Sequence, residues 1–153
     1  MYRKVIVGID FNEGAEQVIA RARAVTDRHG ECHLVHVFEP LDSVYFGVVP
    51  YAPVIAGVDG FEEAARKELS RRLDELAAQE GIPESRRHFL VGTPANELQR
   101  LARDLQADLL VLGTHGRKGV RLLLGSTANA VLHGAGCDIL AVRLREEPLP
   151  EEN

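Results

Sequence analysis

Short, almost purely apolar runs alternate along this chain with longer runs whose apolar residues recur at helical spacing, and this alternation most constrains the fold. The first run, VIVGID at residues 5–10, is typical of a strand buried on both faces. Further strands are expected at residues 32–38, 88–91, 108–112 and 138–144. Helices are expected at residues 13–28 and 61–80, from Pro94 onward, and at 126–133. Parallel strands need crossovers of this length, so the order predicts one α/β sheet with helices on both faces.

Local signals refine these helices. Gly30 is expected to end the first helix, and Thr93 followed by Pro94 predicts a cap and a first-turn proline for the third. The inward face of the second helix is predicted to consist of Phe61, Ala65, Leu69, Leu73 and Leu76.

Composition limits the class of protein. The 153 residues are 45% hydrophobic and 27% charged, which fits one globular domain over residues 1–145 with a frayed acidic tail at 146–153. No apolar run is long enough for a membrane helix, and the first strand leaves no room for a secretory signal. A net charge of -5 argues against nucleic acid as a partner. Cys32 and Cys137 are expected to be two buried thiols in a reducing cytoplasm.

The stretch GTHGRKGVRLLLGST, residues 113–127, carries the clearest chemical signal. Its glycines allow a backbone to approach a ligand closely, and Ser126 and Thr127 stand where a helix offers free amides and two hydroxyls. Arg117, Lys118 and Arg121 add positive charge. These are the components of a phosphate cradle. The same residues also fit turns, an ordinary helix cap and solvated basic side chains, and local chemistry leaves both interpretations open.

Several other nucleotide and hydrolase motifs are absent from the sequence. There is no G-x-x-x-x-G-K-[ST] phosphate loop, and the first strand is followed by GIDFNEGA instead of G-x-G-x-x-G. Neither a G-x-S-x-G elbow nor an H-E-x-x-H helix occurs.

Four segments, VGID, LVHVFEP, VGTPANELQRLARDLQADLLVLGTHGR and LLLGSTANAVLHGAGCDILAVR, together resemble the universal stress protein family over nearly the whole chain. The resemblance implies a five-stranded parallel sheet in the order 3-2-1-4-5, an ATP-binding or a nucleotide-free A-type class, and a dimer. The ATP-binding pattern is glycine, two residues, glycine, nine residues, then glycine with serine or threonine. Gly113, Gly116, Gly125 and Ser126 match it, with a spacer of eight residues from Arg117 to Leu124.

The resemblance also implies roles for individual positions. Ile9 and Val37 would line the adenine pocket, and Asp10 would meet the ribose or the adenine. The residues around the ribose and phosphates would be Gly113, His115, Gly116, Gly125, Ser126 and Thr127. Any Mg²⁺ would be held through the phosphate oxygens of ATP and water. A strand-end acid such as Asp10 also often caps the following helix.

Two functions from different classes follow. One is a regulatory stress-response module that binds ATP with little or no catalysis, at most slow hydrolysis. The other is a nucleotide-free, A-type dimeric stress protein that acts through protein contacts. The resemblance places Asp138–Leu144 at a sheet edge, where pairing across a twofold axis would form a homodimer. A third hypothesis is an enzyme of the related adenine-nucleotide hydrolase group, and the absence of the SGGxDS and HIGH signatures argues against it.

The histidines and one long apolar segment are two further candidate features. His33 and His36 lie three apart on a predicted strand, so they are expected to face opposite sides and not to share a metal. His29, His88 and His133 are isolated in the sequence. The apolar segment Leu41–Gly60, uncharged except for Asp42 and Asp59, is expected either to fold back over its own domain or to serve as a partner or oligomer surface.

Overall fold

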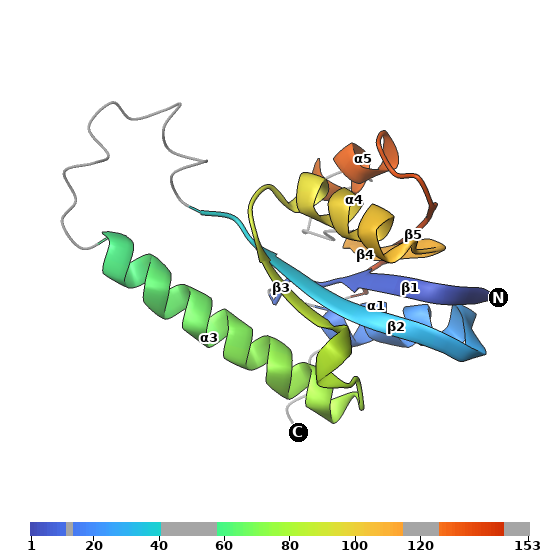
Figure 1. Cartoon of the computed structure of the whole chain (residues 1–153), viewed down its shortest axis with the longest axis horizontal. Helices are drawn as coiled ribbons and strands as arrows, with labels where there is room; N and C mark the ends of the chain where they lie inside the picture. Colours follow the sequence, from blue (N-terminus) through green and yellow to red (C-terminus); the bar gives the residue numbers. More distant parts are fainter. Residues whose placement is uncertain (12–13, 41–57, 115–125, 146–153) are drawn as a thin grey trace, which may run out of the picture.

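The computed structural model describes residues 1–11, 14–40, 58–114 and 126–145. They form a five-stranded sheet in the order β3-β2-β1-β4-β5, and each neighbouring pair of strands is parallel (Figure 1). The strands are β1 (Tyr2–Gly8), β2 (Thr26–Phe38), β3 (Arg87–Val91), β4 (Leu109–Thr114) and β5 (Asp138–Arg143). The helices are α1 (Ala15–Val25), α3 (Val58–Gln79), α4 (Pro94–Leu105), α5 (Ser126–Leu132) and the short η2 (Glu84–Arg86). The predicted α/β class and strand order are therefore confirmed.

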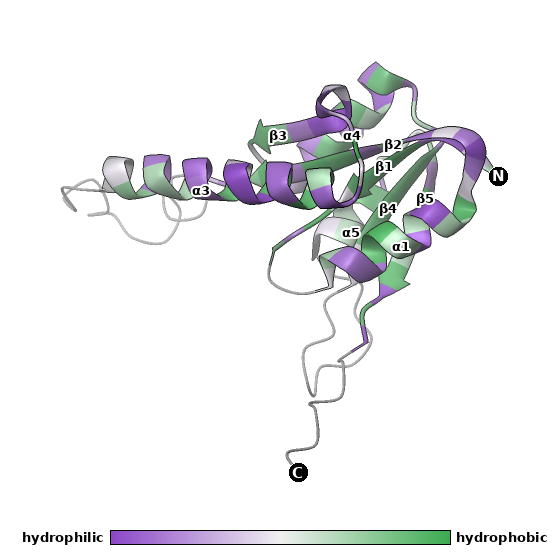
Figure 2. Ribbon diagram, turned by 90° about the horizontal axis from the view of Figure 1, so that it is seen from below, coloured by the Kyte–Doolittle hydropathy of each residue, from purple (hydrophilic) through white to green (hydrophobic). Residues whose placement is uncertain are grey.

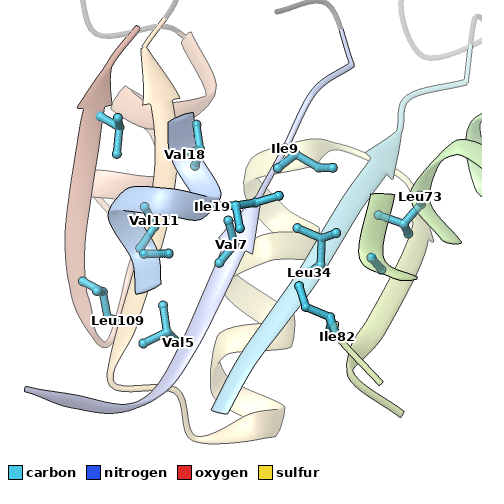
Figure 3. Packing of buried hydrophobic residues seen from close by; sticks show 13 residues of the cluster. Val5, Val7, Ile9, Val18, Ile19, Leu34, Leu73, Ile82, Leu109 and Val111 are labelled. Carbon is cyan, nitrogen blue, oxygen red and sulfur yellow. The ribbon is translucent and has the colours of Figure 1, made fainter. Parts of the chain in front are cut away.

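Two apolar clusters cover the two faces of the sheet. Val5 and Val7 of β1 belong to the cluster that also contains side chains of α1 and α3, shown in Figure 3, whereas Ile6 between them belongs to the cluster that contains side chains of α4 and α5. The central strands are thus buried on both faces, as their apolar runs predict. Hydrophobic residues gather along these strands, and hydrophilic residues mark the outer surface of the helices (Figure 2).

The boundary between α1 and β2 differs from the prediction. The helix ends at Val25, and Thr26 is already extended, with its backbone N–H bonded to the carbonyls of Ala22 and Arg23. Gly30 lies inside β2 and does not end the helix. Tyr2 pairs with Thr26 and Lys4 pairs with Glu31, so the residues in between bulge from the ladder. Glycine fits there because a Cβ would lie 2.9 Å from the carbonyl oxygen of Tyr2.

The predicted inward face of α3 is correct only in part. Leu73 is buried, whereas Phe61 is 69% exposed. The first turns of α3 extend past the sheet, so the periodic apolar stripe continues where no strand lies beneath it (Figure 1). The remaining predicted members of that face, Ala65, Leu69 and Leu76, are half-buried.

Other local predictions have mixed outcomes. Pro94 begins α4 and Thr93 precedes it at the cap position, but the Thr93 side chain makes no cap hydrogen bond. Cys32 and Cys137 are free thiols, half-buried and not fully buried. Segment Leu41–Gly60 lies outside the described residues except for 58–60, which begin α3, and the tail at 146–153 lies outside them as well. No helix in the described ranges is long and apolar enough to cross a membrane.

Candidate functional site

A cavity of about 180 Å³ opens at the carboxyl ends of the central strands. Its floor lies where β1 pairs with β2 on one side and with β4 on the other. The helices that follow β1 and β4, α1 and α5, pack on opposite faces of the sheet. In open α/β sheets, ligands bind at this switch point. The lining residues are Gly8, Ile9, Asp10, Ala15, Val18, Val35, His36, Val37, Pro94, Leu98, Leu112, Gly113, Thr127 and Leu144.

Residues predicted from the sequence meet in this cavity. Ile9, Asp10, Val37, Gly113 and Thr127 all line it, although they come from four separate segments of the chain. Ser126 is the first residue of α5, directly before Thr127. The remaining predicted residues, His115, Gly116 and Gly125, lie outside the described residues, as does all of 115–125.

Two glycines bring the backbone close to neighbouring side chains at the cavity floor. A Cβ on Gly8 would lie 2.5 Å from Cδ2 of Leu112, and one on Gly113 would lie 3.1 Å from Cγ2 of Val18. The first distance is shorter than real Cβ contacts, so a side chain at Gly8 would require the buried Leu112 to shift. The cavity floor is therefore formed by backbone packed tightly under aliphatic walls.

The walls are mainly apolar, with a few polar groups at defined places. Asp10, two residues after the end of β1, supplies a carboxylate, and Thr127 supplies a hydroxyl from the first turn of α5. A mostly apolar hollow with few converging polar groups is typical of small-molecule sites. The N-cap position of α1 is occupied by Gly14, which adopts a left-handed conformation with φ 77°.

Sequence reasoning missed His36 as a lining residue. Its ring is buried, and Nδ1 lies 2.9 Å from the carbonyl oxygen of Ile9. Burial lowers the pKa of His36, against smaller opposing effects from the Ile9 hydrogen bond and the nearby Asp10. The signal available in the sequence was its position directly before Val37, at the end of the strand next to β1.

His33 is not among the lining residues and lies on the opposite face of β2 from His36, as predicted for residues three apart on a strand. Its Nδ1 lies 3.0 Å from Nε2 of His88, and the two rings are stacked. His88 therefore has a partner that its isolation in the sequence did not indicate. The described residues contain no group of three or more metal-ligating side chains.

The family model for the universal stress protein family matches residues 1–143. The chain belongs to this family. Universal stress protein A homolog 2 from Coxiella burnetii (strain RSA 493 / Nine Mile phase I) is 36% identical over 146 residues, which cover 94% of this chain and 97% of the relative.

Solved structures show the same fold. The hypothetical protein MJ0577 superposes with a TM-score of 0.72 at 20% identity, over 96% of this chain and 99% of that one. A universal stress protein in complex with cAMP superposes with a TM-score of 0.60 at 23% identity, over 93% and 97%. At these identities the likeness concerns the fold alone.

Proposed function

We propose that this universal stress protein is a regulatory module that binds an adenine nucleotide, ATP in the first place, with little or no catalysis. One observation carries the proposal: residues from four chain segments, each expected at a nucleotide site, line one cavity at the switch point of the sheet. The universal stress protein crystallised with cAMP provides a precedent for an adenine nucleotide on this fold.

The lining suggests how the nucleotide would lie. Ile9 and Val37 offer apolar contacts for the adenine ring, and Asp10 offers acceptors for ribose hydroxyls or the adenine amino group. Gly113 and Thr127 would border the ribose and phosphates. His115, Gly116 and Gly125, together with Ser126 at the start of α5, would complete the phosphate site, with Mg²⁺ bound through phosphate oxygens and water.

The volume of the cavity agrees with this placement of the base, the sugar and the phosphates. About 180 Å³ is less than the 300–1,000 Å³ or so of most drug-sized ligand sites. The described walls thus accommodate the base and sugar better than a whole triphosphate. The triphosphate would extend toward the N-terminus of α5, where free backbone amides favour anions.

Calorimetry with Mg-ATP, AMP, cAMP and GTP tests the proposal on the intact protein. We expect adenine nucleotides to bind and GTP to bind more weakly. Thr127→Val keeps the side-chain shape and should weaken ATP binding about tenfold, since one hydrogen bond to a charged group is lost. Ser85→Ala, which removes an exposed hydroxyl far from the cavity, should leave the affinity unchanged. No heat and no thermal shift at millimolar nucleotide would contradict nucleotide binding.

We also propose a homodimer formed through residues Asp138–Leu144. In the sheet order, β5 is an edge strand that pairs with β4 on one side only. Its apolar residues Ile139 and Leu140 are half-buried. An open edge of this kind favours pairing with a second copy. If calorimetry finds no nucleotide, this dimer is the basis of the nucleotide-free A-type function.

A further inference from the structure

The segment that carries Asp10 into the cavity lies beyond the carboxyl end of β1. The backbone N–H of Ile9 still donates to the carbonyl of Val35 at 3.0 Å, but Asp10 and Phe11 follow beyond the end of β1. A lining carboxylate on such a segment needs other contacts to fix its place. Two side chains from different elements provide them.

The first of these side chains is His36 of β2. Its Nδ1 lies 2.9 Å from the carbonyl oxygen of Ile9, and because a carbonyl only accepts, Nδ1 carries the proton. The same ring packs against Phe11, with centroids 4.8 Å apart and planes tilted by 48°. Phe89 of β3 lies on the ring as well, at 5.8 Å. His36 thus holds both residues that flank Asp10.

The second side chain is Arg72 of α3. Its guanidinium carbon lies 4.7 Å from the centroid of the Phe11 ring, within the range of a cation–π contact. Its Nη2 also donates a long hydrogen bond of 3.4 Å to the carbonyl of Phe11. Phe11 is therefore in contact with β2 through His36 and with α3 through Arg72.

We propose that His36 and Arg72 are positioning residues that clamp the segment Ile9–Phe11 and thereby hold Asp10 in the wall of the cavity. The affinity consequences rest on the proposed nucleotide function, whereas the clamp itself concerns the ligand-free protein. It also couples the cavity wall to α3, because Arg72 is part of that helix.

The chemistry of the clamp favours a neutral imidazole. The ring is buried between apolar neighbours, and burial lowers the pKa of His36. Two charged groups act on it, with Asp10 favouring the protonated form and Arg72 opposing it. With Nδ1 protonated for Ile9, the neutral ring keeps Nε2 unprotonated.

Nitrogen NMR of the ligand-free protein tests the clamp directly. At pH 7.5 the His36 imidazole should show the neutral tautomer with the proton on Nδ1. His36→Leu should shift the backbone amide signals of Asp10 and Phe11 and speed hydrogen exchange of the segment. His36→Asn should restore most of the wild-type pattern, because its amide can donate from about the position of Nδ1.

Matched variants separate positioning from general destabilisation. His33→Leu removes another buried histidine of β2, on the opposite face of the sheet, and should leave the Asp10 and Phe11 signals in place. Arg72→Met should shift the Phe11 signals. Arg71→Met, at a neighbour that pairs with Glu68 and Glu75, should not shift them. Unchanged signals in His36→Leu, or the other tautomer in the wild type, would overturn the proposal.

The affinity for Mg-ATP is measured on the same variants. If the wild type binds Mg-ATP, His36→Leu should weaken binding about tenfold and His36→Asn less than about threefold, the scale set by one hydrogen bond. Equal loss in both histidine variants would overturn the positioning role. If the wild type binds no nucleotide, the proposed function fails, while the NMR readout still decides whether the clamp exists.

Discussion

At the scale of single residues, Gly8 shows how closely the floor of the cavity is packed. A Cβ at this position would lie 2.5 Å from Cδ2 of Leu112 and 3.4 Å from Cδ2 of Leu98, and both leucines are buried. Gly8→Ala should therefore cost about 1–3 kcal/mol of unfolding free energy, as overpacking of a dense core does. Urea denaturation measures this cost.

The matched control is Gly136→Ala. A Cβ at Gly136 would have no heavy atom within 4 Å, and its backbone is not left-handed. We expect its stability to change by less than about 0.5 kcal/mol. Equal effects of the two substitutions would show that packing against Leu112 is not what requires glycine at residue 8.

Residue-level sequence reasoning found the positions that a strand end brings to the cavity and missed those that depend on cross-strand contacts. The resemblance to the universal stress protein family placed Ile9 and Val37 at the site, and both line the cavity where parallel strands end at one edge of the sheet. The roles of His36 and Arg72 depend on a hydrogen bond across two strands and on a helix packed over Phe11. Neither contact can be predicted from the spacing of residues along the sequence.

At the scale of elements, α3 shows that apolar periodicity does not by itself indicate burial. Leu73 is 2% exposed and packs in the cluster beneath the sheet, whereas Phe61, three turns earlier on the predicted face, is exposed. Leu73→Ala should cost about 2–5 kcal/mol through lost burial and a cavity. Phe61→Ala should change stability by less than about 0.5 kcal/mol. A cost for Phe61→Ala close to that of Leu73→Ala would indicate that Phe61 is covered in solution.

Most element types were predictable, and boundaries were less so. The runs that became β1, β4 and β5 end within two residues of their predicted limits, because apolar runs between helices leave few alternatives. The predicted end of α1 is wrong, because Gly30 lies inside β2 and does not stop the helix. The structure uses that glycine for close approach to β1 inside a bulge, a tertiary requirement that carries no local signal.

At the scale of the whole molecule, buried and half-buried histidines should make folding sensitive to acid. Burial lowers the pKa of His33, His36 and His88 in the folded state. The unfolded chain thus binds protons first as pH falls, so this part of the stability is complete above about pH 7.5 and decreases through pH 6.5 and below. Each extra proton bound by the unfolded chain steepens the loss by at most about 1.4 kcal/mol per pH unit.

The His33–His88 pair provides the variant for this measurement. His33 Nε2 is buried without a hydrogen-bond partner among the described residues, with Glu31 Oε2 3.6 Å away, and Nδ1 faces His88. A second proton between the two rings would set two N–H groups against each other. Replacing both histidines by valine should flatten the stability curve between pH 7.5 and 5 in urea titrations. An unchanged slope would assign the acid sensitivity to other groups.

The proposed dimer would form through the open edge of β5. Ala141 is exposed on that strand, and a twofold axis along the edge would bring two copies of β5 side by side. Ala141→Lys places a charge on the edge, and in the dimer the two lysines would repel, as charges on natural edge strands prevent pairing. Sedimentation at micromolar protein should show a dimer for the wild type and a folded monomer for this variant.

The control is Ala64→Lys, the same change at an exposed alanine of α3. This variant should remain dimeric, because α3 packs on β2 and β3, at the end of the sheet opposite β5. A monomeric wild type, or a dimer unaffected by Ala141→Lys, would rule out association through β5.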